Sequence, residues 1–155
     1  MRLAGERRLG AEPRAVWDFL MDPSRVKHCI PGCVDMQPVA ADEFSAILDV
    51  PIPLLRGPYN ARITVADAVR PEHCSLRLTS HTGFGDVAAE GSLVLSGQSG
   101  TTLLRFDGTL QLGRLTSGFG FGAKLLAAPA KMLLERFFAC MDEQLRPRET
   151  TRPIM

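Results

Sequence analysis

Two of the four cysteines, Cys29 and Cys33, have a spacing that could support metal or redox chemistry. They form a C-x3-C pair around Pro31–Gly32. A zinc site would need two further ligands close in space, and no histidine of the chain has zinc-type spacing. A disulfide between the two cysteines is disfavoured because the chain reverses between them at a rigid Pro-Gly. We therefore expect no metal site and a buried pair without a redox role, with a regulatory disulfide as the alternative.

The histidines and carboxylates do not form a recognisable catalytic group. His28, His73 and His81 could serve as general bases, because histidine titrates near neutral pH. However, no serine or cysteine lies in the G-x-S-x-G context of a nucleophile elbow. Asp86 and Glu90 share a predicted strand but fall on its outer, polar side. We expect solvated histidines and surface carboxylates, and we predict no catalytic residue.

A glycine-rich segment, Gly113–Gly122 (GRLTSGFGFG), precedes the last predicted helix. A phosphate-binding loop would follow G-x-x-x-x-G-K-[ST] or G-x-G-x-x-G, and neither pattern is present. We therefore expect a flexible hinge or lid that leads into the helix. Its Phe119 and Phe121, together with Leu54 and Leu55 of a proline-rich loop, would form the mouth of a cavity.

Length and composition place these residues in a single globular domain. A chain of 155 residues can bury a sufficient hydrophobic core without stabilising disulfides or metal ions. Its net charge of +1 gives no reason to expect nucleic acid as a partner. No apolar run reaches the roughly 18 residues needed to span a bilayer. Scattered cysteines without a signal peptide fit a reducing cytoplasm. We place the ligand-binding domain at residues 1–145 and a disordered polar tail at residues 146–155.

The hydrophobic pattern changes from a short helix to strands and then to a long helix. Strict period two repeats through the middle of the chain, with Val34 and Met36 on one face at its start, and this is typical of a one-sided antiparallel sheet. The fold class is therefore α+β, a curved antiparallel sheet of about six to seven strands wrapped around a long C-terminal helix. The predicted elements are a strand at Arg2–Leu9, a helix at Glu12–Asp22, a short helix through Ile30, strands from Val34 to Leu112 and a helix at Gly122–Leu145.

Small residues on the inward strand faces predict an apolar cavity between the sheet and the last helix. These residues are too short to reach the helix: Ala46, Ala61, Ala89, Gly91 and Gly108. The alternative is that the apolar strip of the helix is simply core. Tyr59, Ser80 and Thr82 are the polar groups expected to reach the cavity. The expected lining is Trp17, Phe44, Leu48, Tyr59, Ile63, Leu78, Phe84, Ala89, Phe106, Leu126, Ala130, Leu133, Leu134 and Phe137.

Several segments resemble the carbon monoxide dehydrogenase G-subunit family, within the START-like, SRPBCC-type helix-grip superfamily. The resemblance covers about residues 1–145, and the pairing of PRAVW with IPGC is its most specific part. It rests on MRLAGERRL at the start, PRAVWDFLMDP at 13–23, CIPGC at 29–33, EFSAILDV at 43–50 and KMLLERFF at 131–138.

The resemblance implies a helix-grip fold with a deep apolar cavity, no catalytic machinery and no covalently bound cofactor. Family members accompany molybdenum-containing carbon monoxide dehydrogenases or related hydroxylases, hold them at the inner membrane face and carry a quinone-like lipid. Many have a C-terminal extension that reaches the membrane. This chain stops at Met155 with a polar tail, so we expect weak or no direct membrane binding. The expected location is cytoplasmic or peripheral at the inner face of the membrane.

Two other functional classes remain open at this point. A cyclase or hydrolase of the same superfamily would need an inward ionisable residue with a perturbed pKa. A protein–protein adaptor would have a filled core and an exposed apolar patch. The sequence leaves the ligand's identity, the partner enzyme and the oligomeric state open, a homodimer included.

Overall fold

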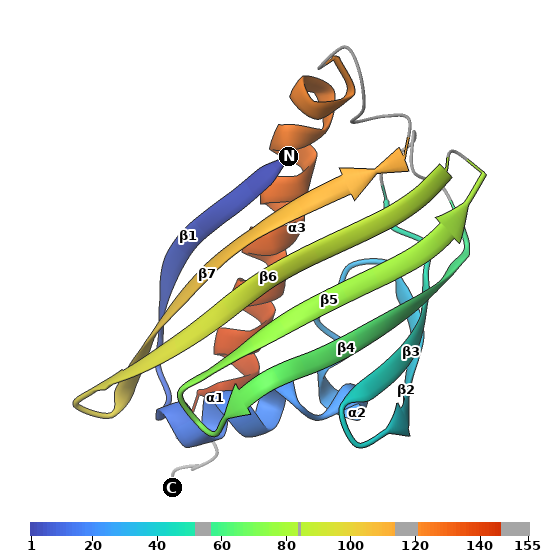
Figure 1. Ribbon diagram of the computed structural model, residues 1–155. Coiled ribbons are helices and arrows are strands. Elements are labelled where there is room, and N and C mark those ends of the chain that lie inside the picture. Colours follow the sequence, from blue (N-terminus) through green and yellow to red (C-terminus); the bar gives the residue numbers. More distant parts are fainter. Residues whose placement is uncertain (52–56, 84, 114–120, 147–155) are drawn as a thin grey trace, which may run out of the picture.

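The computed structural model describes residues 1–51, 57–83, 85–113 and 121–146. A seven-stranded antiparallel sheet in the order β1-β7-β6-β5-β4-β3-β2 curves around one long helix, α3 (Figure 1). The predicted α+β helix-grip architecture is confirmed. The elements are β1 (Arg2–Leu9), α1 (Pro13–Leu20), α2 (Pro23–Val26), β2 (Cys33–Ala40), β3 (Glu43–Leu48), β4 (Tyr59–Val69), β5 (His73–Thr82), β6 (Gly85–Gln98), β7 (Thr101–Leu112) and α3 (Phe121–Leu145).

Period-two patterning determines which side chains face α3. Leu78 of β5 pairs with Ala89 of β6, which pairs with Leu110 of β7, so one apolar row crosses three strands. The next inward row contains Leu76, Gly91 and Gly108 instead. Because the side chains of a strand alternate between faces, the residues between these positions point to solvent.

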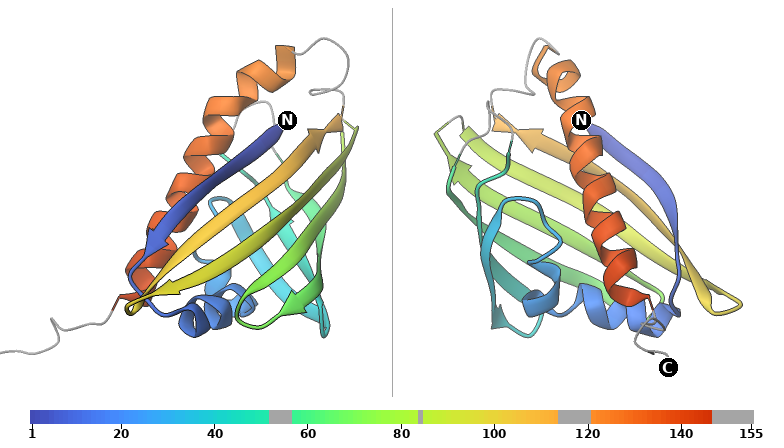
Figure 2. Two further views of the ribbon diagram at one scale, coloured as in Figure 1. Left: turned by 60° about the vertical axis from the view of Figure 1, so that its left-hand side comes forward. Right: turned by 180° about the vertical axis from the view of Figure 1, so that it is seen from behind.

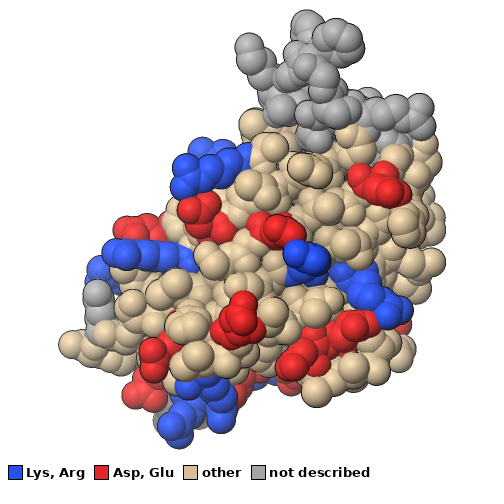
Figure 3. Space-filling view, in the orientation of Figure 1, with Lys and Arg blue, Asp and Glu red and all other residues tan. Residues whose placement is uncertain are grey.

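The outer face of the sheet carries charges of both signs, interspersed over the strands (Figure 3). Neighbouring strands pair them across the sheet, as in Arg77–Glu90 at 2.6 Å and Arg2–Asp107 at 2.8 Å. Such exposed ion pairs contribute little to stability. Their relevance is that the charged side chains around the sheet's centre are turned away from α3.

Helix α3 lies across the concave face of the sheet, and α1 and α2 close one end (Figure 2). Its inward side includes the buried Leu126, Phe138 and Met141, while Lys131 and Glu135 are exposed, as an amphipathic helix requires. The helix contains Pro129, which has no N–H to donate to the preceding turn.

Three local predictions differ from the structure. Helix α1 ends at Leu20, because Asp22 begins α2 by accepting a hydrogen bond from the Ser24 N–H at 3.0 Å. Helix α2 itself ends at Val26 instead of Ile30. Val34 is 65% exposed, because a register irregularity between Cys33 and Asp35 takes it out of the strict alternation with Met36.

Candidate functional site

Three adjacent, almost wholly apolar cavities lie between the sheet and α3. A fourth hollow, of about 590 Å³, lies between β1 and α3 and has Lys131 and Glu135 in its lining. The first of the three, here called the α2-end cavity, has a volume of about 250 Å³ and is closed at one side by Val26 and Ile30. The central cavity, about 400 Å³, lies over Gly91 and Gly108. The upper cavity, about 180 Å³, lies beneath Leu126 in the first half of α3. The walls shared by neighbouring cavities are Ile30, Ile63, Leu76, Leu78, Leu93, Phe106, Leu110 and Leu134.

Most residues expected to line the cavity do line these three spaces, and their role in ligand binding stays a prediction. Around the α2-end cavity are Phe44, Ile63, Phe106, Leu134 and Phe137. The central cavity adds Leu78 and Ala89. The upper cavity adds Leu48, Tyr59, Leu126, Ala130 and Leu133.

Trp17 is placed elsewhere. Its side chain is 6% exposed and belongs to the main core cluster, without contributing to the lining of the three cavities. Phe84 and the expected mouth residues Leu54, Leu55 and Phe119 lie outside the described residues. Phe121 begins α3, but its side chain is not described.

Sequence reasoning missed two groups of lining residues. The first group could have been found, because it follows the inward period-two faces of the strands, with Phe138 of α3 beside it. It consists of Leu3, Met36, Val50, Val65, Leu76, Val87, Leu93, Leu104, Leu110, Leu112 and Phe138. The second group comes from the turn region of α1 and α2, where periodicity gives no signal. It consists of Leu20, Met21, Pro23, Val26 and Ile30.

Two hydroxyl groups of the upper cavity, those of Ser80 and Thr82, are hydrogen-bonded to the main chain. Ser80 Oγ donates to the Asn60 carbonyl at 2.7 Å, and Thr82 Oγ1 donates to the Gly85 carbonyl at 2.6 Å. Burial, with a smaller contribution from the negative charge of Asp49, raises the pKa of Tyr59, so this phenol is neutral at ordinary pH. The cavity wall is therefore almost wholly hydrocarbon.

The ionisable groups considered for catalysis lie at the surface. His81 Nδ1 is 2.7 Å from Asp86 Oδ1, but their side chains are 90% and 81% exposed. Glu90 pairs with Arg77 on the outer face. Within the described ranges, no three His, Cys, Asp or Glu side chains lie close enough together to hold a metal ion. No helix in the same ranges is long and apolar enough to cross a membrane.

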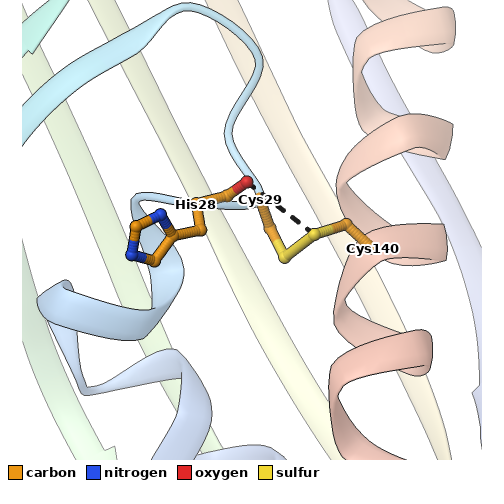
Figure 4. Close-up of a disulfide and its surroundings, with 3 residues drawn as sticks. All are labelled: His28, Cys29 and Cys140. Carbon is orange, nitrogen blue, oxygen red and sulfur yellow. Dashed lines mark hydrogen bonds between the residues drawn. A yellow bond between two sulfur atoms is a disulfide. The ribbon is translucent and has the colours of Figure 1, made fainter.

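The expected pairing of Cys29 with Cys33 is wrong, because Cys29 forms a disulfide with Cys140 of α3 (Figure 4). The absence of a redox role stays a prediction. The two residues are 111 positions apart, and their Cα atoms lie 5.4 Å from each other. Sequence reasoning weighed only the local C-x3-C pair and did not foresee that the fold brings α3 beside Cys29. Cys33 and Cys74 remain thiols, and burial raises the pKa of each.

A curved sheet that grips a long helix, with apolar cavities between them, defines a helix-grip fold. The sequence model of the CoxG family, which is named for the G-subunit of carbon monoxide dehydrogenase, matches residues 5–146. The chain therefore belongs to the CoxG family.

Solved structures of the same fold cover nearly the whole chain. A conserved protein from Geobacillus kaustophilus is 29% identical with a TM-score of 0.82, over 94% of this chain and 95% of that one. A START superfamily protein from Mycobacterium smegmatis is 14% identical with a TM-score of 0.68, over 94% and 99%. The di-domain ARO/CYC BexL from the BE-7585A biosynthetic pathway is 10% identical with a TM-score of 0.68, over 96% and 50%. No curated protein matches the chain significantly.

Proposed function

We propose that this protein binds an apolar, quinone- or lipid-like small molecule between the sheet and α3 without transforming it. It would act as an accessory or carrier protein of a molybdenum-containing carbon monoxide dehydrogenase-type enzyme. Family membership supports the accessory role, since the family is named for a component of that enzyme. No covalently bound cofactor is part of the proposal.

The hydrocarbon wall of the three cavities is the observation that carries this proposal. Ser80 and Thr82 donate their hydroxyl hydrogens to main-chain carbonyls, so these two groups have no hydrogen left to donate to a ligand. Affinity would come from burying apolar area, at roughly 25 cal/mol per Å² before the costs of association. A charged head group would lose its hydration without a partner, so the head group would stay outside the cavity.

An enzyme of the cyclase type is the second candidate, because the BexL structure shares the fold. Such chemistry needs an acid or base that reaches the substrate. The charged residues at the floor of the central cavity are Arg77, Glu90 and Asp107, and they form ion pairs on the outer face. The geometry thus favours a carrier. A protein–protein adaptor without a ligand is disfavoured in turn. Such a protein is expected to have a filled core, whereas this one has cavities between the sheet and α3.

The proposed location is the cytoplasm or the inner face of the membrane, with weak membrane contact of the protein itself. Disulfides in a reducing compartment are generally transient or redox-sensing. The Cys29–Cys140 bond would then be a reversible one in this location.

Native mass spectrometry of the purified protein, followed by solvent extraction, tests the proposal. The expected result is a bound, solvent-extractable hydrophobic molecule whose mass disappears from the protein after extraction. A ligand-free protein that also fails to take up added quinones or lipids would contradict it. Turnover of the extracted molecule by the isolated protein would favour the enzyme instead.

A further inference from the structure

We propose that the Cys29–Cys140 disulfide is a redox-controlled clamp on the α2-end cavity. In the oxidised protein it holds two cavity walls together around the ligand. Reduction by a dithiol lets these walls separate and speeds ligand exchange. The inference rests on the proposed function, because it concerns the molecule bound in that cavity.

The bond joins opposite walls of one cavity. Cys29 immediately precedes Ile30, and Cys140 lies one helical turn after Phe137. Both Ile30 and Phe137 line the α2-end cavity. Figure 4 shows the short bridge from the segment after α2 to α3. The bond therefore restrains movement of the segment that carries Ile30 away from the part of α3 that carries Phe137.

The other polar ties of α3 lead to the opposite side of the helix. Glu135 pairs with Arg7 of β1 at 3.0 Å, and Asp142 accepts a hydrogen bond from the Gly10 N–H at 2.9 Å. Among residues 1–51, 57–83, 85–113 and 121–146, the disulfide is the one tie between α3 and the α2 side other than apolar packing. Its loss would free that side while β1 still holds the helix.

After reduction, Cys140 of α3 would still contact the segment that follows α2. Cys140 Sγ lies 3.8 Å from the main-chain oxygen of His28. A disulfide sulfur has no hydrogen to donate, so this approach becomes a weak hydrogen bond only after Cys140 is a thiol. The reduced protein therefore keeps a soft contact in the same place. A change in the rate of opening is expected to exceed the change in equilibrium structure.

The exposure of the two sulfur-bearing residues suggests the direction of attack. Cys29 is 3% exposed, whereas Cys140 is half-buried. A thiolate of the dithiol would attack Cys140 Sγ, and the electron pair of the broken bond would leave on Cys29 Sγ, which takes up a proton. The second thiol of the reductant then attacks the mixed disulfide and releases Cys140. The protein gains two thiols and the dithiol becomes a disulfide.

The rate of release of a neutral dye tests the clamp. Protein loaded with Nile red would be mixed with an excess of phosphatidylcholine vesicles, with or without prior reduction by dithiothreitol. Reduction is expected to speed release about tenfold or more, with a change in affinity of less than about threefold, as gating implies. Alkylation of the free thiols would establish the redox state of the protein. It should label two thiols, those of Cys33 and Cys74, before reduction and four thiols after it.

Two variants serve as controls. Cys33→Ser removes a free thiol but keeps the disulfide, so it should respond to reductant as the unaltered protein does. The double variant Cys29→Ser, Cys140→Ser should release the dye rapidly with or without reductant. A double variant as slow as the oxidised protein would overturn the clamp.

Hydrogen exchange of the ligand-free protein separates failure of the clamp from failure of the proposed function. Reduction should lower protection at residues 26–33 and 134–142 while leaving β5 and β6 unchanged. Loss of protection throughout the molecule, or at neither segment, would overturn the clamp even if the dye binds. Absence of dye uptake in both redox states would defeat the proposed function, and the exchange pattern would still decide whether the bond holds these segments together.

Discussion

Gly91 of β6 and Gly108 of β7 face each other so closely that a Cβ on Gly108 would lie 3.1 Å from the Gly91 Cα and 2.6 Å from the carbonyl oxygen of Glu90. A Cβ on Gly91 would likewise lie 3.2 Å from the Gly108 Cα. The pair forms the floor of the central cavity. Two glycines thus supply both the close approach of the strands and the empty space above them.

Replacement of Gly108 by alanine is expected to destabilise the protein. The added methyl group would meet main-chain atoms, which move only if the strands shift, and overpacking of this kind typically costs about 1–3 kcal/mol. The free energy of unfolding in urea measures the effect. Gly83→Ala is the matched control, because a Cβ there would have no atom of the described residues within 4 Å apart from its own residue and its chain neighbours. Equal stability of the two variants would contradict the crowding described here.

Affinity should depend on hydrocarbon length and hardly on hydrogen bonding. For a series of straight-chain alcohols, each added methylene is expected to contribute about 0.8 kcal/mol, or about fourfold in Kd, until the cavity is filled. Fatty acids of equal length should bind more weakly at neutral pH, because Arg77, the one described cation in the lining of the three cavities, is already paired with Glu90 on the outer face. Competition with Nile red measures both series. A steep preference for carboxylates would contradict a hydrocarbon site.

Stability should fall at alkaline pH through Tyr59. The pKa of this phenol is raised in the folded state, so above about 10, where the unfolded chain loses its proton, the folded protein binds more protons. The slope of stability against pH is then negative from the unfolded pKa up to the folded one. Tyr59→Phe should make the decline shallower.

The single tyrosine of the chain makes this prediction easy to check. Tyrosinate absorbance reports Tyr59 alone, and it should appear at higher pH in the folded protein than in urea. Coincident titrations in the two states would refute the raised pKa. Urea unfolding of Tyr59→Phe and of the unaltered protein over the same pH range supplies the stability comparison.

Repetitive local patterns made most of the fold predictable. The alternation of Leu76, Leu78 and Ser80 with polar neighbours specifies one face of β5, and the same rule holds for the other long strands. The small inward residues also indicated space below α3. Trp17 was misassigned because an apolar residue on a short helix is equally compatible with core and with cavity wall.

The disulfide and the α2-end wall depended on contacts that no local pattern encodes. Cys29 and Cys140 come together only because the whole sheet curves and returns the chain beside α2. Ile30 lies in a short irregular segment before β2, where neither period two nor period 3.6 applies. Such long-range pairs become visible only once the packing of α3 is known.

The binding of Nile red to two tryptophan variants of α3 tests the central claim most directly. Phe137 lines the α2-end cavity, whereas Met132, on the same helix, is 54% exposed. If this cavity is the ligand site, Phe137→Trp should fill it and abolish dye binding with little loss of melting temperature, while Met132→Trp should bind normally. If Phe137→Trp instead lowers the melting temperature strongly and leaves dye binding unchanged, the residue belongs to a packed core and the proposed carrier function is contradicted.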